Sequence, residues 1–447
     1  MTILRFSSYA TRIRDALLLI AAIGTLVGTT ACGSGSTAPK TGGGGLTVTI
    51  TAPTGVTPNV TVTGPDGYTK ALTATATLSG LTPGSYVVAA ASVTTTNAIV
   101  GILIAATVSG SPATVAASGN AAAATVTYSQ RPGSGGLWIA NLGASKSAVQ
   151  YTAAQLASTT SAAAATTIGT GTDENMGAAF DANGNLWLTH FGANTVAEYS
   201  ASQLNASGAP TPAVTLSANA ESLSDPAGLA FDSSGNLWIV NASTATVVEF
   251  TASQLASTGS PTPAVTISAS SASLDEPIGI AFDASGNLWV SNIGGSIVAF
   301  TPSQVAASGA PTPTVILTAA AGSINGPLMI AFDASGKLWV ANGDHGQNTV
   351  VAFSPSQLTT TGSPTPVVTL SANAGSLNGP AGLAFDASGS LWVSNLDGTS
   401  PTVVGFTASQ IATSGSPTPN VTVTSSSLSE PFGLAFDPHA ASLPIKP

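Results

Sequence analysis

The chain has 447 residues, of which only 6% are charged, and its mean hydropathy is +0.37. Soluble domains are usually nearer a quarter charged, so these values point first to a membrane protein. A transmembrane helix, however, needs about 20 consecutive apolar residues, and the longest comparable run after the N-terminus, Ala98–Val108, is too short. The net charge of −10 also excludes a nucleic-acid partner, because no basic stripe is present to neutralise phosphates.

The N-terminal residues have the pattern of a secretory signal. Three arginines precede an apolar run, Ala16–Val27, and small residues then lead to Cys32, the only cysteine of the chain. The pattern resembles a bacterial lipoprotein signal, in which the cysteine is lipidated, although Thr29 stands where that motif usually has an aliphatic residue. We therefore expect a signal peptide over residues 1–31, a lipidated Cys32 and a flexible tether over residues 32–45.

This resemblance implies a location for the protein. It predicts secretion across the cytoplasmic membrane and a lipid anchor in the bacterial cell envelope, periplasmic or at the cell surface, with the acyl chains as the only membrane contact. An unpaired cysteine in an oxidising compartment would be a liability, which favours lipidation. The alternative is ordinary secretion with an incidental cysteine.

Residues 46–130 consist of alternating or β-branched runs separated by Pro, Gly and Asn turns, which predicts a small β-sandwich. Within this region Leu78–Val88 resembles the L-x-x-L-x-P-G-x-Y-x-V corner of transthyretin-like and other Ig-like surface modules. The resemblance implies an Ig-like domain. We expect it to serve as a spacer or stalk, with carbohydrate or protein binding as the alternative.

From residue 135 onward the chain repeats itself, and all six tryptophans occupy the same place in the repeat, 49 to 53 residues apart. They are Trp138, Trp187, Trp238, Trp289, Trp339 and Trp392. Each unit predicts four short strands, as in Gly279–Phe282, Leu288–Asn292, Ser296–Phe300 and Thr314–Leu317. A D-x-S-G-N turn joins the first two, with Asp closing an Asx turn and Gly taking a positive φ. One such unit cannot bury both of its faces, so the units must stack radially, as in a β-propeller.

The two ends of the repeat predict the number of blades. The first tryptophan strand, Gly136–Asn141, has no first strand before it, and the last first strand, Gly433–Phe436, has no tryptophan strand after it. The two complete one another, so we predict an all-β chain with six blades over residues 135–447. The C-terminal strand closes the ring and leaves no open sheet edge within it. The protein is expected to be a monomer.

The repeated motif P-x-G-[LI]-A-F-D-x-S-G-N-L-W-[VI]-x-N is followed by T-V-V-x-F, as at Thr246–Phe250 and Thr349–Phe353. These residues resemble the NHL-repeat propellers and their relatives, the streptogramin-lyase-like and gluconolactonase-like proteins. The resemblance implies the architecture. It leaves the activity open, because propellers of this kind include scaffolds, ligand binders and enzymes.

Functional positions are sought where the units differ, because a residue repeated in every unit is usually structural. We expect two rings of side chains on the face that carries the inter-blade loops. One ring precedes the P-x-G motif; it is glycine in two units, Gly326 and Gly379, and acidic in four adjacent units: Glu430, Glu174, Asp225 and Glu276. The other ring ends the tryptophan strand; it is His190 in the second unit and asparagine elsewhere: Asn141, Asn241, Asn292, Asn342 and Asn395.

We expect a ligand-binding surface on this face. It comprises the four acids with His190, Asn241 and Asn292, together with Asp344 and His345 from a polar loop of the fifth unit. A crescent of carboxylates could hold a divalent cation or a cationic ligand, or raise the pKa of one member. No other cofactor is expected. The alternative is that these acids cap loops and keep a weakly charged surface soluble.

An enzyme is the second hypothesis. In gluconolactonase-like propellers the metal ligands include Asn and Asp at the x of P-x-G, but all six equivalents here are apolar: Met176, Ala227, Ile278, Leu328, Ala381 and Phe432. Streptogramin-lyase-like chemistry needs a base such as histidine, for which His190 is the candidate, and His345 lies roughly opposite it across the ring. We therefore expect a binding or scaffold protein that recognises an envelope polymer, peptide or protein. A lyase- or lactonase-like activity at the same face is the alternative.

Overall fold

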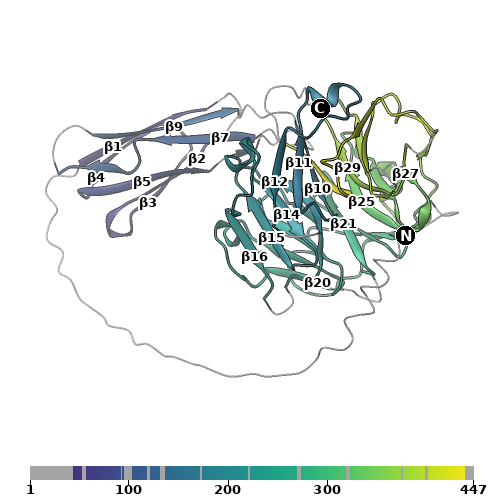
Figure 1. Cartoon of the computed structure of the whole chain (residues 1–447). Helices are drawn as coiled ribbons and strands as arrows, with labels where there is room; N and C mark the ends of the chain where they lie inside the picture. Colours follow the sequence, from purple (N-terminus) through teal and green to yellow (C-terminus); the bar gives the residue numbers. More distant parts are fainter. Residues whose placement is uncertain are drawn as a thin grey trace, which may run out of the picture. The chain divides into compact units, whose positions relative to one another are not determined.

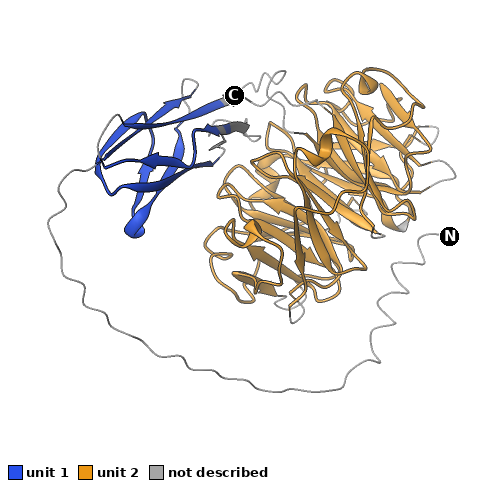
Figure 2. Ribbon diagram, turned by 60° about the vertical axis from the view of Figure 1, so that its left-hand side comes forward, with its two compact units in different colours: residues 1–93, 104–129 blue, residues 94–103, 130–447 orange. Residues whose placement is uncertain are grey.

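Figure 1 shows the computed structural model of the chain. It describes residues 44–52, 57–91, 93–94, 103–117, 121–130, 136–171, 174–219, 222–268, 273–318, 323–373, 376–397 and 401–437. The predicted signal peptide, Cys32 and most of the predicted tether lie outside the described residues. The chain divides into two compact units, one within residues 1–93 and 104–129 and one within residues 94–103 and 130–447 (Figure 2). No helix in the described ranges is long and apolar enough to cross a membrane.

The first unit contains one five-stranded and one four-stranded sheet. The first has the order β4-β1-β9-β7-β6, with strands Ala76–Leu81, Gly44–Thr51, Ala122–Gln130, Leu103–Ser109 and Val93–Thr94. The second has the order β3-β2-β5-β8, with strands Thr69–Leu72, Asn59–Thr63, Gly84–Ala91 and Ala113–Val115. Tyr128 on β9 connects the two sheets, because its hydroxyl accepts a hydrogen bond from the Asn59 N–H of β2 at 2.8 Å.

The second unit is built from six antiparallel four-stranded sheets, called blades 1 to 6 below. Blade 1 combines β10–β12 (Leu137–Asn141, Ser147–Tyr151, Thr166–Gly169) with the last strand, β33 (Pro431–Phe436). The other blades follow the chain: β13–β16 (Asn175–Phe180, Leu186–His190, Thr195–Tyr199, Val214–Ser217), β17–β20 (Pro226–Phe231, Leu237–Asn241, Thr246–Phe250, Val265–Ser268), β21–β24 (Pro277–Phe282, Leu288–Asn292, Ser296–Phe300, Val315–Thr318), β25–β28 (Pro327–Phe332, Leu338–Asn342, Thr349–Phe353, Val368–Ser371) and β29–β32 (Pro380–Phe385, Leu391–Asn395, Thr402–Phe406, Val421–Thr424).

The prediction of six blades closed by the C-terminal strand is confirmed. β33 pairs antiparallel with β10, with Phe436 opposite Leu137 and Pro431 opposite Asn141. The first strands of successive blades contact one another all the way round, and β33 contacts both β13 and β29. This closed ring of four-stranded sheets defines the second unit as a six-bladed β-propeller.

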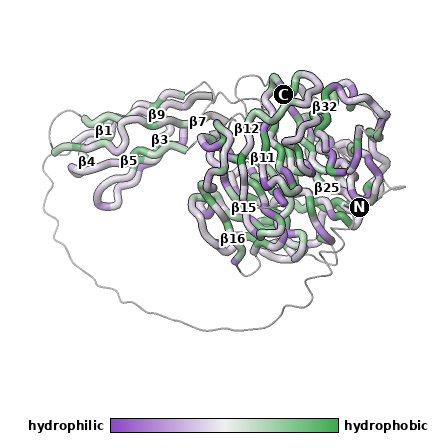
Figure 3. The backbone as a smooth tube through the Cα atoms, viewed as in Figure 1, coloured by the Kyte–Doolittle hydropathy of each residue, from purple (hydrophilic) through white to green (hydrophobic). Residues whose placement is uncertain are grey.

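The tryptophans pack between blades, as their repetition indicates. In blades 2 to 6 the indole Nε1 donates to the turn aspartate of the same blade, as from Trp289 to Asp283 at 2.9 Å. The same indoles meet a phenylalanine of the next blade edge-on; the ring centroids of Trp289 and Phe332 are 6.1 Å apart. The sequence after β33 does not continue into D-x-S-G-N, and in the part of the chain that the structure describes Nε1 of Trp138 in blade 1 has no partner. In Figure 3 hydrophobic and hydrophilic stretches alternate along the strands.

The outer strand of every blade is covered by a short segment of the following blade. Gly259 of blade 3 donates its N–H to the Thr215 carbonyl on β16, and its own carbonyl accepts from the Ser217 N–H, at 3.0 and 2.9 Å. Parallel bridges of this kind join all six pairs of neighbouring blades. We call these segments the edge straps: residues 159–160, 207–208, 258–259, 308–309, 361–362 and 414–415.

Candidate functional site

The loop face is the end of the propeller at which each first strand begins and each tryptophan strand ends. In all six blades one backbone hydrogen bond joins the residue before the first strand to a residue just after the tryptophan strand, the second one in blade 5 and the first one in the others. In blade 4 the Ile293 N–H donates to the Glu276 carbonyl at 3.1 Å. The two rings expected from the sequence therefore lie beside one another within every blade.

The ring of acids has a backbone conformation of its own. All six of its residues are left-handed, with φ between 49° and 62°. Glycine adopts this region freely and aspartate tolerates it, whereas a longer side chain crowds the backbone. The conformation explains Gly326 and Gly379 directly. It does not explain why Glu174, Glu276 and Glu430 carry longer side chains at the same place.

Two loops place carboxylates near the ring's glycines. A methyl group built on Gly379 would lie 2.8 Å from Cγ of Asp397, so the Asp397 carboxyl fills the space that a side chain there would take. In blade 5 the Asp344 N–H donates to the Gly326 carbonyl at 3.2 Å. Burial, reinforced by the nearby Asp344 carboxylate, raises the pKa of Asp397. Every blade thus contributes a carboxylate to this face. The sequence predicted a crescent of four carboxylates and, separately, a polar loop with Asp344.

The asparagines of the second ring are buried and bonded within the protein. The Asn241 amide nitrogen donates to the Ser222 carbonyl and to Thr246 Oγ1, both at 3.1 Å, and its oxygen accepts from the Ser224 N–H. Asn292 makes the equivalent three bonds, two with the loop before blade 4 and one with Ser296 of β23. These contacts fasten each entry loop to its blade. They use both amide hydrogens, so the predicted ligand-binding role of Asn241 and Asn292 has no geometric support.

His190 occupies a different environment from the asparagines. The entry loop of blade 2 is shorter than the others and lacks the Ser-Leu pair that the asparagine holds elsewhere, such as Ser222–Leu223. The imidazole is 3% exposed, its Nδ1 lies 3.0 Å from Thr195 Oγ1, and no group of the described residues bonds its Nε2. Burial lowers the pKa of His190 to about 4. Its cross-strand neighbour Asn175 replaces a proline of the other blades, and within the same described ranges its Oδ1 has no partner either.

The carboxylates do not gather into a metal centre. Among the described residues, no three His, Cys, Asp or Glu side chains lie close enough together to hold a metal ion. The predicted cation site is therefore not assembled from Glu430, Glu174, Asp225 and Glu276 in this part of the chain. The backbone of His345 lies in the 3-10 turn Asp344–Gly346, and its side chain is outside the description.

The apolar positions at the x of P-x-G are buried. Each of the six side chains is at most 2% exposed. The first strands of the ring therefore present no polar side chain at the places where a gluconolactonase-like metal site would need ligands.

A buried hydroxyl between alternate blades was missed in the sequence. The residue before the ring asparagine or histidine is Thr189, Ser291 or Ser394 in blades 2, 4 and 6 and aliphatic in the others. Each hydroxyl accepts from a glycine N–H of its own blade and donates to a carbonyl of the next blade; Ser291 connects Gly279 and Leu328 in this way. The alternation is visible once the units are aligned and could have been found there.

Two buried glutamates at the opposite end of the propeller were also missed. Glu198 and Glu249 are 8% and 9% exposed. Burial, with a smaller contribution from the turn carboxylate of Asp181, raises the pKa of Glu198 to about 7. Burial and Asp232 also raise the pKa of Glu249. Blade 1 has Gln150 at the same position, so a neutral side chain of this size fits there.

The chain matches no known family model and no curated protein. Among solved structures it is similar to virginiamycin B lyase from Staphylococcus aureus, with 17% identity over 55% of this chain and 71% of that chain and a TM-score of 0.37. It is similar to a streptogramin B lyase, with 14% identity over 64% and 75% and a TM-score of 0.36. It is also similar to a protein of unknown function from Bacteroides caccae, with 11% identity over 68% and 98% and a TM-score of 0.47.

Proposed function

We propose that the loop face of the propeller binds a cationic partner, namely a basic segment of a peptide or protein. The observation that carries this proposal is the presence of a carboxylate in every blade of the face. Three of these carboxylates belong to glutamates whose left-handed backbone suits glycine better. The turn alone does not select glutamate there, and positions under backbone strain are often retained for binding.

The charge of the propeller supports the same conclusion. Between residues 136 and 437 the sequence contains two basic residues, Lys146 and Lys337. Lys337 lies at the opposite end, 3.9 Å from the turn aspartate Asp333, which leaves Lys146 as the one basic residue of the described loop face. A surface of one sign attracts ligands of the other and speeds their association. Carboxylates in every blade suit a partner with several spaced positive groups.

Blade 3 provides a matched pair of variants. Asp225→Asn and Glu249→Gln each remove one carboxyl group, the first on the loop face and the second at the opposite end of the same blade. With an oligolysine peptide as the probe at low salt, Asp225→Asn should weaken binding severalfold and Glu249→Gln should leave it unchanged. Binding should also fall steeply with added salt. Equal effects of the two variants, or no binding by the wild-type chain, would refute the proposal.

The alternative, a lyase- or lactonase-like enzyme at the same face, has weaker support from the geometry. Its candidate base, His190, is buried, and burial is the cause that lowers its pKa to about 4. A general base must reach the proton that it abstracts. If His190→Asn abolished a lyase or lactonase activity while binding of oligolysine remained, the enzyme would replace binding of a basic segment as the proposed function.

The proposal includes a location and a spacer. We place the protein outside the cytoplasm, held to the envelope by a lipidated Cys32, with the first unit as an Ig-like stalk that separates the propeller from the membrane. Support comes from the N-terminal pattern and from the two sheets of the first unit. Labelling of cells with a palmitate analogue should mark the wild-type chain and not Cys32→Ser. Label in both forms, or in neither, would contradict the anchor.

A further inference from the structure

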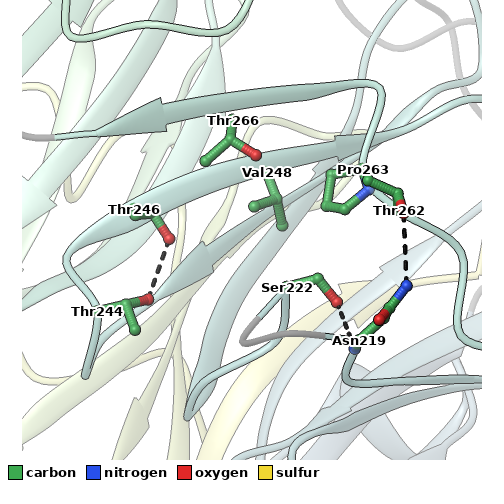
Figure 4. A pocket seen from close by; sticks show the side chains of 8 residues that line it. All are labelled: Asn219, Ser222, Thr244, Thr246, Val248, Thr262, Pro263 and Thr266. Carbon is green, nitrogen blue, oxygen red and sulfur yellow. Dashed lines mark hydrogen bonds between the residues drawn. The ribbon is translucent and has the colours of Figure 1, made fainter. Parts of the chain in front are cut away.

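A pocket of about 350 Å³ lies on blade 3, and residues from the two loops that hold Asp225 contribute to its lining. Two residues of the entry loop, the two outer strands β19 and β20, and the segment that follows the edge strap line this open pocket (Figure 4). Its lining is Asn219, Ser222, Thr244, Thr246, Val248, Thr262, Pro263 and Thr266. None of these side chains is charged, and five of the eight carry a hydroxyl group.

The polar groups of the pocket are only partly used by the protein. Asn219 donates its N–H to Ser222 Oγ at 2.8 Å, and its amide nitrogen lies 3.4 Å from Thr262 Oγ1, which is a long hydrogen bond. The hydroxyls of Thr244 and Thr246 are 3.1 Å apart. In the described part of the chain no group bonds the Thr266 hydroxyl, which therefore retains its donor and acceptor capacity.

We propose that this pocket binds a neutral sugar residue. Hydroxyl and amide groups that both donate and accept match the hydroxyls of a sugar ring, while Val248 and Pro263 offer an apolar surface for its C–H groups. None of the described lining residues is charged, which disfavours ionic ligands. The volume is at the lower end of the range of small-molecule pockets, roughly 300 to 1,000 Å³, which fits one or two rings.

The site is a feature of particular blades and not of the repeat. Blade 4 has Ile316 in place of Thr266, and the short entry loop of blade 2 has no counterpart of Asn219 or Ser222. Blade 6 retains Asn373 and Ser376, but its loop after the tryptophan strand is longer and carries Asp397. This inference uses different residues and a different ligand chemistry from the proposed loop-face function, so either can fail alone.

The test is saturation-transfer NMR on the full chain with the methyl glycosides of glucose, galactose, mannose and N-acetylglucosamine. At least one glycoside should bind, and Thr266→Val should weaken it roughly threefold to tenfold, the effect of one lost hydrogen bond. Ile316 shows that a β-branched aliphatic side chain is accepted at this strand position. The matched control is Thr215→Val, the same position in blade 2, which should bind like the wild type.

Two results would overturn the proposal: no transfer to any of the four glycosides, or equal affinities for Thr266→Val and wild type. Should Thr266→Val fail to fold, Asn219→Ala, at an exposed position, provides the second measurement with the same expected loss. Binding of oligolysine should be the same in Thr266→Val and wild type, which separates this site from the loop face.

Discussion

Glu276 has φ at 49°, where its side chain crowds the backbone, and Gly326 and Gly379 hold nearly the same conformation in blades 5 and 6 without that cost. A left-handed residue other than glycine costs roughly 1 to 2 kcal/mol relative to the right-handed region. Under the proposed function, stability and ligand binding make opposite demands on this one residue.

Replacing Glu276 with glycine is expected to leave the free energy of unfolding unchanged or to raise it by up to about 1 kcal/mol. Relief of the left-handed strain is partly offset by the greater freedom of glycine in the unfolded chain. Urea denaturation measures the difference. Glu276→Ala keeps the strain and should not stabilise. A clear loss of stability in Glu276→Gly would mean that the carboxylate supports the fold.

Glu198 should make stability depend on pH. Its pKa is about 7 in the folded protein and near 4.5 when unfolded, so folding favours the protonated form. The stabilisation from the protonated form of Glu198 is fully present below about pH 4.5 and is lost as the pH rises through 7. The free energy of unfolding should fall by about 1 to 3 kcal/mol over this range. Glu198→Gln, which copies Gln150, should be the more stable form at pH 8 and should flatten the profile between pH 5 and 8.

His190 changes the stability with pH in the opposite direction, over an overlapping pH range, and its variant serves as the control. Its folded pKa of about 4 lies below the ordinary 6.5, so its contribution is present above pH 6.5 and is lost as the pH falls toward 4. His190→Asn should therefore change the acid side of the profile and leave the change between pH 7 and 8 intact. An unchanged profile in Glu198→Gln would contradict the raised pKa.

At the scale of elements, the blades are joined by more than apolar contacts. The hydroxyls of Thr189, Ser291 and Ser394 each bridge a backbone N–H and a carbonyl from neighbouring blades, and all three are fully buried. A buried backbone group that loses its partner costs about 1 to 3 kcal/mol. The first strands are therefore fixed to one another at three points around the ring.

Ser291→Ala should lower the free energy of unfolding by about 1 to 3 kcal/mol, because the Gly279 N–H and the Leu328 carbonyl lose their shared partner. Ser291→Thr retains the hydroxyl, as Thr189 does in blade 2, and should be close to wild type. Thermal unfolding with both variants checks this. Equal stability of Ser291→Ala and wild type would show that water replaces the bridge.

The elements were predictable from the sequence because one unit recurs. The strand around Trp289, its D-x-S-G-N turn and the complementary ends of the repeat together predict six blades and the pairing of β33 with β10, which the structure contains. Any error in a strand assignment would have appeared six times. The repeat thus provided its own test of the fold.

The details of the candidate site were not predictable in the same way. Asp397 fills the space beside Gly379 because of a loop whose length occurs in no other unit. The conformation of this loop therefore cannot be predicted from the repeat. The burial of His190 follows from a shortened entry loop, whose effect on the neighbouring strand cannot be derived from residue types. The asparagines seemed to be surface residues because their bonds to the entry loops are tertiary contacts.

At the scale of the whole molecule, the closing strand holds the first and last blades together. β33 supplies the innermost strand of blade 1, and it contacts the first strands of blades 2 and 6. Its residues Leu434 and Phe436 belong to the hydrophobic cluster that joins blades 6 and 1. The ring is therefore complete only when the last strand of the chain has been placed.

Deleting residues 431–447 should open the propeller. β10 would gain an unpaired edge and the cluster around Leu434 would be exposed, so we expect a lower unfolding midpoint, loss of a single cooperative transition and a tendency to aggregate. Calorimetry and light scattering measure these effects. Adding a peptide of residues 429–437 in trans should restore the transition. A truncated chain that unfolds like the full one would show that blade 1 is stable with three strands.

The edge straps have a consequence for a protein with so few charges. The net charge of −10 makes copies of the chain repel one another, but with only 6% of its residues charged there are few side chains to block pairing at an exposed strand edge. An uncovered outer strand would let two propellers join side by side into a continuous sheet. Here the backbone groups that would start such growth already bond to the strap of the adjoining blade, on all six blades. The edge straps therefore protect the protein against aggregation through its strand edges. Mutations in the edge straps should cause fibres to form before the fold itself changes.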